Sequence, residues 1–257
     1  MTLEKPKVIG VIPARYASQR LPAKPLIDLL GKSMVQRVYE QAKKSRLLDL
    51  VVVATDDARI EDAVKRFGGS VLLTSPEIKN GSERVAVVAS QMAGDIFVNI
   101  QGDEPLIAPE MIDQGVQLLL DDSSVPVGTL VKKVEVHADL MNPNVVKVVV
   151  DHHGNALYFS RSVIPFLRDE QETVRWLEKH TFYKHIGLYC FRKTFLMQYT
   201  QIPASALEHA EKLEQLRILE AGYTIRTGVT AYESIPIDTP EDVSRVETLL
   251  RQVSSHV

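Results

Sequence analysis

Short apolar runs alternate with amphipathic segments through the first hundred residues. The apolar runs have the length and composition of buried strands and cover residues 8–12, 50–54, 71–73 and 96–100. Amphipathic patterns between them predict three helices, which begin at Ser33 and cover roughly 57–67 and 82–92. This alternation predicts an α/β fold: a doubly wound, mostly parallel sheet with helices on both faces.

The second half of the chain is less regular. Strand-like runs occur at 125–131, 145–150, 156–159 and 186–191, and residues 151–155 form a predicted hairpin turn. Residues 163–184 show no clean period, so we expect them to leave the main sheet. The capping-box pair Ser205 and Glu208 predicts a helix to about Glu220, and Pro240 begins a final helix with Val243, Val246, Leu250 and Val253 on its buried side. We therefore predict one domain, residues 1–257, with an insertion at about 125–200.

A basic loop follows the first predicted strand. It carries Arg15, Arg20 and Lys24, two prolines at 22 and 25, and no acidic residue before Asp28. Ligands of open α/β sheets bind beyond the carboxyl ends of the strands, and Arg and Lys suit phosphate oxygens. The loop is therefore interpreted either as a triphosphate cradle or as an ordinary solvated basic loop. The prolines favour the cradle, because they lower the cost of holding the charges in place.

Two aspartates are candidate ligands for a metal ion. Asp103 follows a buried strand in the motif QGDEP, and Asp238 precedes Pro240 at the predicted end of another strand. Carboxylates at strand ends suit Mg²⁺, which is usually shared with substrate phosphates. Each aspartate also has a plain structural explanation: a turn for Asp103, and capping of the final helix by Asp238 or Thr239 for the second.

A further set of polar residues lies in the second half of the chain. On a helical wheel Glu214 falls among the apolar residues of the helix predicted from Ser205, so it should be paired, with Arg217 a possible partner, or bind a ligand. Arg161 ends a strand and could hold an acidic substrate's carboxylate. His185 precedes another strand and is either a ligand group or a satisfied core histidine.

Composition and absent motifs narrow the function. With 45% hydrophobic residues and a net charge of −3, the chain can build a full core and shows no general affinity for nucleic acid or anionic membrane. The single cysteine, Cys190, lies among apolar residues and is expected to be an inert core thiol. No signal peptide or membrane span is evident, so we expect a cytoplasmic protein. Dinucleotide, P-loop and serine-hydrolase motifs are absent.

Nine motifs occur along the chain in a characteristic order. They are IPARYASQRLPAKPL, VVVATDD, NGSER, VNIQGDEP, NPNVVKVV, ALYFSRSVIP, HIGLYCFR, LEQLR and DTPED. In this order they resemble the CMP-Kdo synthetase family, the 3-deoxy-manno-octulosonate cytidylyltransferases, from about Val8 to Glu247. Two departures are small: Ala23 stands where the family usually has Gly, and Ser82 where Thr is common.

The resemblance implies a reaction and a set of roles. CTP and Kdo give CMP-Kdo and pyrophosphate with Mg²⁺ as cofactor, in a cytoplasmic homodimer that supplies lipopolysaccharide biosynthesis. The resemblance also implies that the insertion at about 125–200 forms the dimer contact and contributes to sugar binding. The resemblance makes Arg15, Lys24, Asp103 and Asp238 catalytic, with the two aspartates as metal ligands. It implies nucleotide binding by Pro13, Ala14, Arg15, Arg20, Lys24, Ser82, Arg84 and Gln101. It implies sugar binding by Arg161, His185, Glu214 and Gln215.

Two other functions fit parts of this pattern. A cytidylyltransferase for another acid sugar, such as 8-amino-Kdo or sialic acid, would share the nucleotide motifs; LEQLR and FSR favour Kdo over sialic acid. A catalytically silent nucleotide-sugar sensor would be expected to lack at least one metal-binding carboxylate or phosphate-binding cation, and this chain has all of them.

Overall fold

The computed structural model describes residues 5–17, 21–78 and 80–254. The chain forms two compact units, Met1–Asp113 with Glu233–Val257, and Gln114–Tyr232. We refer to them as unit 1 and unit 2. Unit 2 contains the region around 125–200, and the assignment of that region as an insertion in a single domain stays a prediction.

Unit 1 contains a parallel sheet. Its strands are β1 (Val8–Ala14), β2 (Leu50–Thr55), β3 (Ser70–Leu73) and β4 (Ile96–Asn99), in the spatial order β3-β2-β1-β4. All three pairings between them are parallel. The apolar runs of β1, β2 and β4 form strands whose side chains are buried on both faces, whereas the edge strand β3 is partly exposed. The four predicted strands are confirmed.

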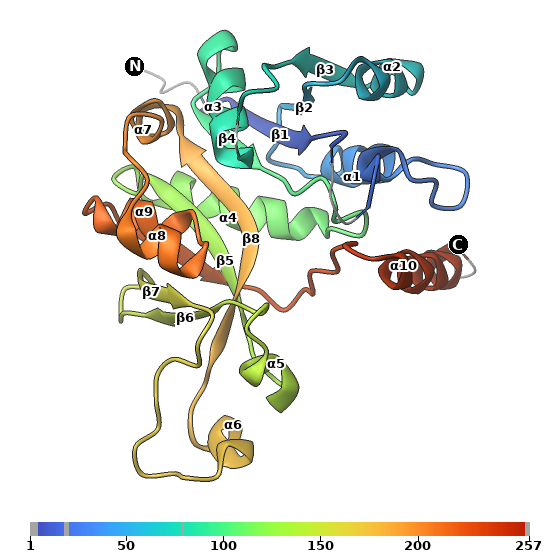
Figure 1. Ribbon diagram of the computed structural model, residues 1–257. Coiled ribbons are helices and arrows are strands. Elements are labelled where there is room, and N and C mark those ends of the chain that lie inside the picture. The colour runs from blue at the N-terminus through green and yellow to red at the C-terminus, as the bar shows by residue number, and fades with distance from the viewer. Residues whose placement is uncertain (1–4, 18–20, 79, 255–257) are drawn as a thin grey trace. The chain divides into compact units, whose positions relative to one another are not determined.

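Helices cover both faces of this sheet. Helix α1 (Met34–Ala42) packs on β1 and β2, α2 (Ala58–Arg66) packs on β2 and β3, and α3 (Gly81–Gln91) packs on β1 and β4. Figure 1 shows α1 and α2 on one side and α3 on the other. Right-handed crossovers explain this arrangement. Strands β1 to β3 are added toward one edge of the sheet, whereas β4 is added at the other edge, so the helix before β4 lies on the opposite face. The predicted doubly wound α/β class is confirmed.

Local capping residues set the helix ends. The Ser33 hydroxyl accepts from the Gln36 backbone N–H as predicted, but the Gln36 side chain donates to Glu40 instead of reaching back, so only half of the capping box forms. Asn80 caps α3 in the same way, accepting from the Glu83 N–H at 2.8 Å. Gly68, at φ 76°, follows the end of α2 as predicted.

The order of the strands creates a switch point in unit 1. The chain leaves β1 toward β2 on one side, whereas β4 lies on the other side of β1. In open α/β sheets the crevice beyond the carboxyl ends of two such strands is the usual ligand site. The basic loop follows β1, and QGDEP follows β4. The topology therefore brings both motifs to one place.

Unit 2 is built from antiparallel pairs and one parallel pair. Strand β5 (Val127–Lys133) pairs antiparallel with β8 (Tyr183–Arg192) and parallel with β9 (Ile225–Val229). Strand β6 (Lys147–Val150) pairs antiparallel with β7 (Ala156–Ser160) and with β8. The hairpin predicted around 151–155 is confirmed. Strand β9 is not evident from the sequence pattern.

The remaining helices are mostly short. They are α4 (Pro109–Asp121), α5 (His137–Met141), α6 (Trp176–Lys179), α7 (Lys193–Tyr199), α8 (Ala206–Glu211), α9 (Gln215–Glu220) and α10 (Pro240–Ser254). Within 163–184, Trp176 and Phe182 stack and pack with Val134 and Leu140 into a small separate core, which explains why this segment has no simple period. In α10, Val246 is buried and Val243 and Leu250 pack beside it as predicted; the side chain of Val253 lies outside the described residues.

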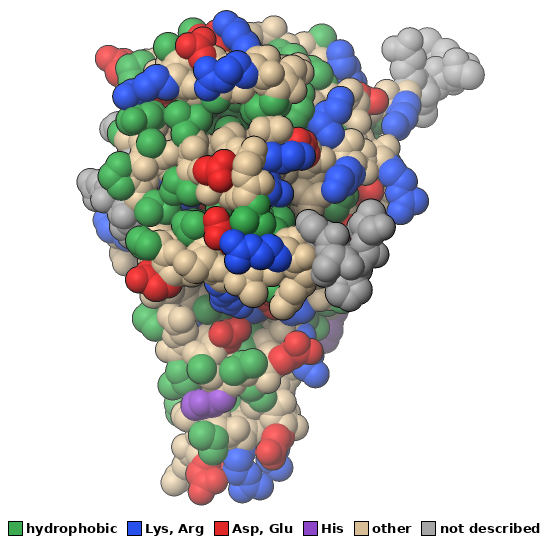
Figure 2. All heavy atoms as spheres, turned by 90° about the vertical axis from the view of Figure 1, so that its right-hand side faces the viewer, with side chains coloured by type: hydrophobic (Ala, Val, Ile, Leu, Met, Phe, Trp, Pro, Cys, Tyr) green, Lys and Arg blue, Asp and Glu red, His purple; other side chains and the backbone are tan. Residues whose placement is uncertain are grey.

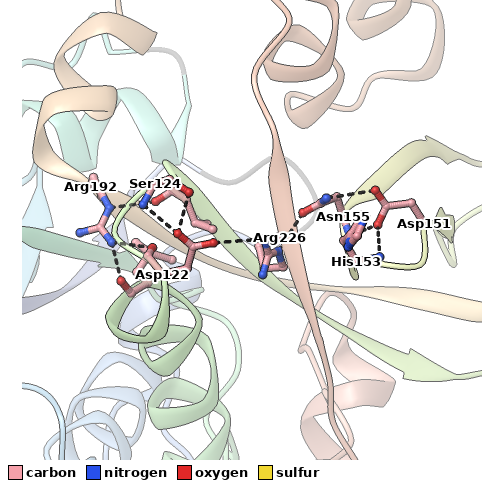
Figure 3. Close-up of polar contacts among 9 residues, drawn as sticks. Asp122, Ser124, Asp151, His153, Asn155, Arg192 and Arg226 are labelled. Atoms are coloured by element: carbon pink, nitrogen blue, oxygen red, sulfur yellow. Dashed lines mark hydrogen bonds and ion pairs between the residues drawn. The ribbon is translucent and has the colours of Figure 1, made fainter.

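An arginine ties the hairpin turn to β9 in unit 2. The Arg226 Nε donates to Asn155 Oδ1 at 2.8 Å, and its Nη2 lies 3.4 Å from Asp122 Oδ2 (Figure 3). Asp151 closes the turn by accepting from the backbone N–H groups of His153 and Asn155. The turn is thus fixed by local Asp bonds and anchored to a strand far away in sequence.

One predicted helix is wrong. The segment from Ser205 to Glu220 does not form a single helix, because Lys212 adopts a left-handed conformation (φ 54°) and ends α8. The Ser205–Glu208 capping box does form, and Gly222 (φ 81°) follows the end of α9. The helical-wheel argument for Glu214 assumed one continuous helix and therefore fails in its premise.

Acidic and basic side chains are intermingled on the surface seen in Figure 2. Among the helices of the described part of the chain, none is both long and apolar enough to cross a membrane. Cys190 is fully buried, and this burial raises the pKa of its thiol, which fits the prediction of an inert core cysteine.

Candidate active site

A cleft of about 310 Å³ lies at the switch point of unit 1. We call it the strand-end cleft. Its walls come from the loop after β1, the first turn of α3 and the QGDEP loop after β4. The lining residues are Pro13, Ala14, Arg15, Ala17, Lys24, Pro25, Asn80, Gly81, Gln101, Gly102 and Asp103. Six of the residues predicted to bind nucleotide or metal are therefore brought together as expected.

Close backbone packing shapes the cleft. A Cβ atom on Gly102 would lie 2.6 Å from the backbone carbonyl oxygen of Pro13, so only glycine lets the QGDEP loop approach the end of β1 this closely. Across the cleft, a Cβ atom on Gly81 would lie 3.3 Å from the Asn99 side chain. These two glycines hold the three walls close together.

The central feature of the cleft is a lysine between two aspartates. Lys24 Nζ lies 2.7 Å from Asp103 Oδ2 and 3.0 Å from Asp238 Oδ1. The two carboxylate oxygens are thus no farther apart than the sum of these distances. The Lys24 side chain is 14% exposed, and the aspartates are 30% and 35% exposed, so the group is reachable from solvent. Two carboxylates and one ammonium meet at a single point.

Lys24 owes its place to a short 3-10 helix, η1 (Lys24–Leu26). Ala23 precedes it with φ 54°, a left-handed conformation in which glycine is favoured. Pro25 follows at the start of the turn and fixes the backbone after the lysine. The position where the related family usually has Gly is thus one where the backbone itself favours Gly.

The strand predicted to end at Asp238 is wrong. Residues 233–238 have no regular secondary structure. The extended segment is held by the backbone N–H of Ile237, which donates to the Asp103 carbonyl at 2.9 Å. Asp242 Oδ2 then accepts from the backbone N–H groups of Asp238 and Thr239, both at 2.9 Å. Helix α10 is capped by Thr239 and Asp242, while the Asp238 carboxylate contacts Lys24.

Arg15 lies beside the cleft in a half-buried position. One of its N–H groups donates to the carbonyl of Ile78, which fixes the guanidinium near the start of α3. A guanidinium has further donors in a planar fork that matches phosphate oxygens. Arg20, also predicted to bind nucleotide, lies outside the described residues.

Arg84 and Ser82 do not line the strand-end cleft. Arg84 is fully buried, with Nη2 2.8 Å from Asp56 Oδ2 and Nη1 donating to Thr74. Burial and the nearby charge of Arg15 lower the pKa of Arg84, whereas Asp56 opposes that shift. Ser82 is also buried, in the first turn of α3. Their role in nucleotide binding stays a prediction.

Several lining residues were missed by the sequence argument. Asn80 and Gly81, at the start of α3, line the cleft although the sequence pattern assigned them no role in the site. Ala17, Pro25 and Gly102 also line it. The signal for Gly102 was present, since a glycine between a strand end and an acidic residue often marks a close approach of backbone.

Glu104 is an unusual neighbour of Asp103. Its side chain is 5% exposed, and burial raises its pKa to about 7; the nearby charge of Asp103 adds to the shift, whereas a hydrogen bond with Ser234 opposes it. Ser234 belongs to the same extended segment as Asp238. Glu104 therefore gives the QGDEP loop a second link to that segment.

In unit 2, Arg161 is held by backbone carbonyls. Its Nε donates to the Glu211 carbonyl at 2.7 Å and its Nη1 to the Pro143 carbonyl at 3.0 Å. The Glu211 carboxylate accepts from the Arg161 backbone N–H and from the Ser160 hydroxyl. The end of β7 is thus fastened to the end of α8. Glu211 was not predicted, and nothing in its local sequence indicates this role.

A buried lysine supports the same corner. Lys147 is fully buried, and its Nζ donates to the carbonyls of Asn142, Val145 and Arg161 at 2.6–2.8 Å. Burial lowers the pKa of Lys147, the like charge of Arg161 adds to this, and Glu211 opposes it. All three ammonium protons have acceptors, which satisfies the buried charge.

The other predicted sugar-binding residues lie in β8 and α9. His185 is half-buried between the rings of Phe159 and Tyr189, and burial lowers its pKa to about 3, so the ring is neutral at physiological pH. Gln215 is 5% exposed at the start of α9, and Glu214 is half-buried just before it. Arg217, proposed as a partner for Glu214, makes a two-pronged ion pair with Glu208, with both contacts at 2.6 Å.

Asp103 and Asp238 are the residues whose side chains could hold a metal ion at the cleft. Within the described residues, no group of three or more His, Cys, Asp or Glu side chains is placed to hold a metal ion. Asp103 and Asp238 form a pair on one cation. Mg²⁺ is commonly bound through one or two carboxylates with substrate phosphates completing its shell. The donor set therefore fits a magnesium ion that arrives with a nucleotide.

Comparison with known proteins identifies the class. The family model described as cytidylyltransferase matches residues 9–227. The chain belongs to the cytidylyltransferase family.

Individual relatives give the comparison more detail. A 3-deoxy-manno-octulosonate cytidylyltransferase of Parabacteroides distasonis is 52% identical, over 95% of this chain and 98% of the relative. A protein of the same name from Geobacter sulfurreducens is 50% identical, over 93% and 97%. A structure of CMP:2-keto-3-deoxy-manno-octonic acid synthetase complexed with CTP matches with a TM-score of 0.90 and 43% identity, over 96% and 99%. The resemblance seen in the sequence motifs is confirmed.

Proposed function

We propose that the protein transfers CMP from CTP to 3-deoxy-D-manno-octulosonate, giving CMP-Kdo and pyrophosphate for lipopolysaccharide biosynthesis. The geometry that carries this proposal is the convergence of Lys24, Asp103 and Asp238 at one edge of the strand-end cleft. The nature of the substrates follows from relatives about 50% identical that carry the name of this activity. A phosphate-binding cation and two carboxylates are the groups that nucleotidyl transfer requires.

The reaction exchanges one phosphorus–oxygen bond for another. The anomeric hydroxyl oxygen of Kdo attacks the α-phosphorus of CTP, and the bond from that phosphorus to the bridging oxygen of the β-phosphate breaks. Pyrophosphate leaves with the electron pair, and the hydroxyl proton passes to solvent. Little covalent chemistry is asked of the protein, so catalysis consists of positioning and charge neutralisation.

Cations of the basic loop do the neutralising. Arg15, anchored at Ile78, binds phosphate oxygens with its remaining donors. Lys24 exchanges its aspartate partners for the triphosphate and meets the charge that develops on the leaving pyrophosphate. The backbone of Ala14 and the side chain of Gln101, both lining the cleft, face the nucleoside. Ser82 and Arg84, both buried in α3, are proposed to help shape the nucleoside pocket.

Asp103 and Asp238 are proposed to hold Mg²⁺. When bound, the ion neutralises phosphate charge and lowers the pKa of the attacking hydroxyl. In the structure, the two carboxylates are compensated by Lys24, and this avoids the repulsion between like charges so close together.

Arg161, His185, Glu214 and Gln215 are proposed to bind the sugar acid. A guanidinium pairs with a carboxylate, and the neutral imidazole and the amide suit hydroxyl groups. The bonds from Arg161 to the Glu211 and Pro143 carbonyls fix its direction. A fixed guanidinium binds a carboxylate with less loss of entropy.

An Asp103→Asn variant tests this function. We expect pyrophosphate release from CTP and Kdo to fall at least a hundredfold, while the urea midpoint stays close to that of the wild type. The matched control is Asp95→Asn, because Asp95 accepts a hydrogen bond from the Lys7 backbone and does not line the cleft. Near-normal turnover by Asp103→Asn contradicts the proposed role.

A substrate panel separates Kdo from other acid sugars. Kdo, 8-amino-Kdo and sialic acid are each supplied with CTP, with and without Mg²⁺, and pyrophosphate is measured. We expect Kdo with Mg²⁺ to give the highest kcat/KM. Calorimetric binding of CTP without turnover of any sugar would instead identify a nucleotide-sugar sensor.

We propose further that the enzyme is a cytoplasmic homodimer. The support is the segment 163–184, which exposes Phe166 at 75% and Val174 at 63%, although Phe166 also packs edge-on against Trp176. Exposed apolar side chains of this size mark association surfaces. Sedimentation of a Phe166→Asp variant should show a monomer where the wild type is a dimer.

A further inference from the structure

Strand β8 contains an irregularity next to His185. In the antiparallel pairing with β5, Leu130 is opposite Ile186 but Thr129 is opposite Tyr189. Gly187 and Leu188 are therefore extra residues in β8, and the strand bulges after Ile186, one residue beyond the histidine. Bulges of this kind commonly redirect a side chain and are frequent near active sites.

Thr129 lies directly under this bulge. It is fully buried, and its hydroxyl oxygen lies 2.7 Å from the Leu188 carbonyl, 3.2 Å from the Ile186 carbonyl and 2.9 Å from His185 Nε2. A hydroxyl has a single proton, and carbonyl oxygens only accept. The proton therefore goes to a carbonyl, with Leu188 at the shorter distance, and the hydroxyl oxygen must accept from the ring.

This arrangement decides the protonation of the ring. If His185 Nε2 donates to Thr129, it carries a hydrogen. Because the ring is neutral, Nδ1 then has none and presents a lone pair. Among the described residues the ring makes no other hydrogen bond than that with Thr129, and His185 is only half-buried.

We propose that Thr129 is a positioning residue that holds His185 as the Nε2–H tautomer, so that Nδ1 accepts a hydrogen bond from a hydroxyl group of the sugar acid. That the ligand is the sugar acid rests on the proposed function. The consequence is chemical selectivity: Nδ1 favours a donor, such as a hydroxyl, and repels a carbonyl or carboxylate oxygen at the same position. Thr129 itself need not touch the substrate.

A first experiment reads the tautomer directly in the wild-type protein. Two-bond proton–nitrogen correlation spectra of the ¹⁵N-histidine-labelled enzyme, without substrate, distinguish Nε2–H from Nδ1–H. We expect the Nε2–H pattern for His185, assigned by its loss in His185→Asn. An Nδ1–H pattern overturns the proposal without any change to Thr129 and without reference to catalysis.

A second experiment removes the hydroxyl. Thr129→Val keeps the side-chain shape, Thr129→Ser keeps the hydroxyl, and Thr227→Val is the matched control. Thr227 is the register partner of Thr129 in β9, is also buried, and donates to the Gly154 carbonyl at 2.8 Å. The control therefore loses a comparable hydrogen bond without touching His185.

We expect Thr129→Val to populate the Nδ1–H tautomer and to raise KM for Kdo about tenfold, the effect of one lost hydrogen bond of about 1.4 kcal/mol. KM for CTP should match that of Thr227→Val, and Thr129→Ser should restore both readouts. If Thr129→Val keeps the tautomer, or changes KM for both substrates only as much as the control, the proposal is wrong. If wild-type enzyme does not turn over Kdo, the proposed function fails, while the wild-type spectrum still decides the pairing of Thr129 and His185.

Discussion

The backbone N–H of Ile237 donates to the carbonyl of Asp103 at 2.9 Å. This backbone hydrogen bond joins the QGDEP loop to a segment near the end of the chain, alongside the bond between Glu104 and Ser234. It places Asp238 beside Asp103, so that both carboxylates reach the ammonium of Lys24. The pairing of the two aspartates is therefore supported by a backbone contact between their two segments.

Asp242 should affect catalysis because it fixes the backbone of Asp238. Its carboxylate accepts from the N–H groups of Asp238 and Thr239, and these bonds lower its pKa. We expect Asp242→Ala to reduce the free energy of unfolding by about 1 kcal/mol, as for loss of a helix cap, and to lower kcat about tenfold because Asp238 is no longer fixed.

The matched control is Asp57→Ala, which removes the cap of α2 and is not among the residues that line the cleft. It should lose similar stability in urea denaturation while kcat stays near the wild-type value. Equal loss of kcat in the two variants would mean that Asp242 acts through stability alone.

Lys24 should compete with metal ions in the absence of nucleotide. Its ammonium occupies the point where the two carboxylates converge. Lys24→Met should abolish turnover, because phosphate charge is no longer neutralised. The same variant should bind Mn²⁺ without CTP about five- to tenfold more tightly, since a competing cation of about 1 kcal/mol is removed.

Electron paramagnetic resonance of free Mn²⁺ measures this affinity. Lys32→Met is the control, because Lys32 pairs with Glu40 at 2.6 Å on the surface, where such pairs contribute little. Unchanged Mn²⁺ affinity in Lys24→Met would argue against a metal site at Asp103 and Asp238.

The parts of the site that follow strands could be predicted from the sequence. The buried apolar runs of β1 and β4 are unmistakable, and the strand order of an α/β sheet brings the loops after them together. Arg15, Lys24 and Asp103 were located by this argument alone. The strand-end argument works because it needs only local sequence: the apolar run that forms a strand and the charged residue that follows it.

Other parts depend on contacts between distant residues and were not predictable. The pattern around Asp238 suggests a strand, but the segment has no strand geometry. It is held by the bond from Ile237 to the Asp103 carbonyl and by the bond between Ser234 and Glu104. The helix predicted from Ser205 is broken because Lys212 takes a left-handed backbone conformation, which nothing in its residue type indicates. The burial of Arg84 likewise depends on Asp56 in a different loop.

Ala23→Gly should stabilise the protein. Ala23 has φ 54°, where a Cβ atom costs roughly 1–2 kcal/mol, partly offset by the greater entropy of glycine in the unfolded chain. We expect a gain of about 0.5–1 kcal/mol in urea denaturation. Ala138→Gly, in helix α5, should show the opposite sign, with a loss of about 1 kcal/mol. A loss in both variants would contradict the strain assigned to Ala23.

Lys147 should be required for the geometry of Arg161. Replacing it with Met leaves three backbone carbonyls without their buried donor, including that of Arg161. We expect the free energy of unfolding to fall by about 3 kcal/mol and KM for Kdo to rise, while KM for CTP changes little. Lys132→Met is the control, because that lysine donates to the Ala231 carbonyl at an exposed position. Stability within 1 kcal/mol of the wild type in Lys147→Met would refute the assignment.

His185 should make the protein sensitive to mild acid. Its pKa is about 3 in the folded state, against 6.5 ordinarily, because the ring is buried. Between these values the unfolded chain binds a proton that the folded protein does not, so this contribution to stability is complete above pH 6.5 and is lost as the pH falls toward 3. Relative to His185→Asn, which cannot titrate, the wild type should lose about 1–2 kcal/mol between pH 7 and pH 5. Urea denaturation of both proteins across this range measures the difference, and parallel curves would show that the folded protein accommodates a charged His185 without cost.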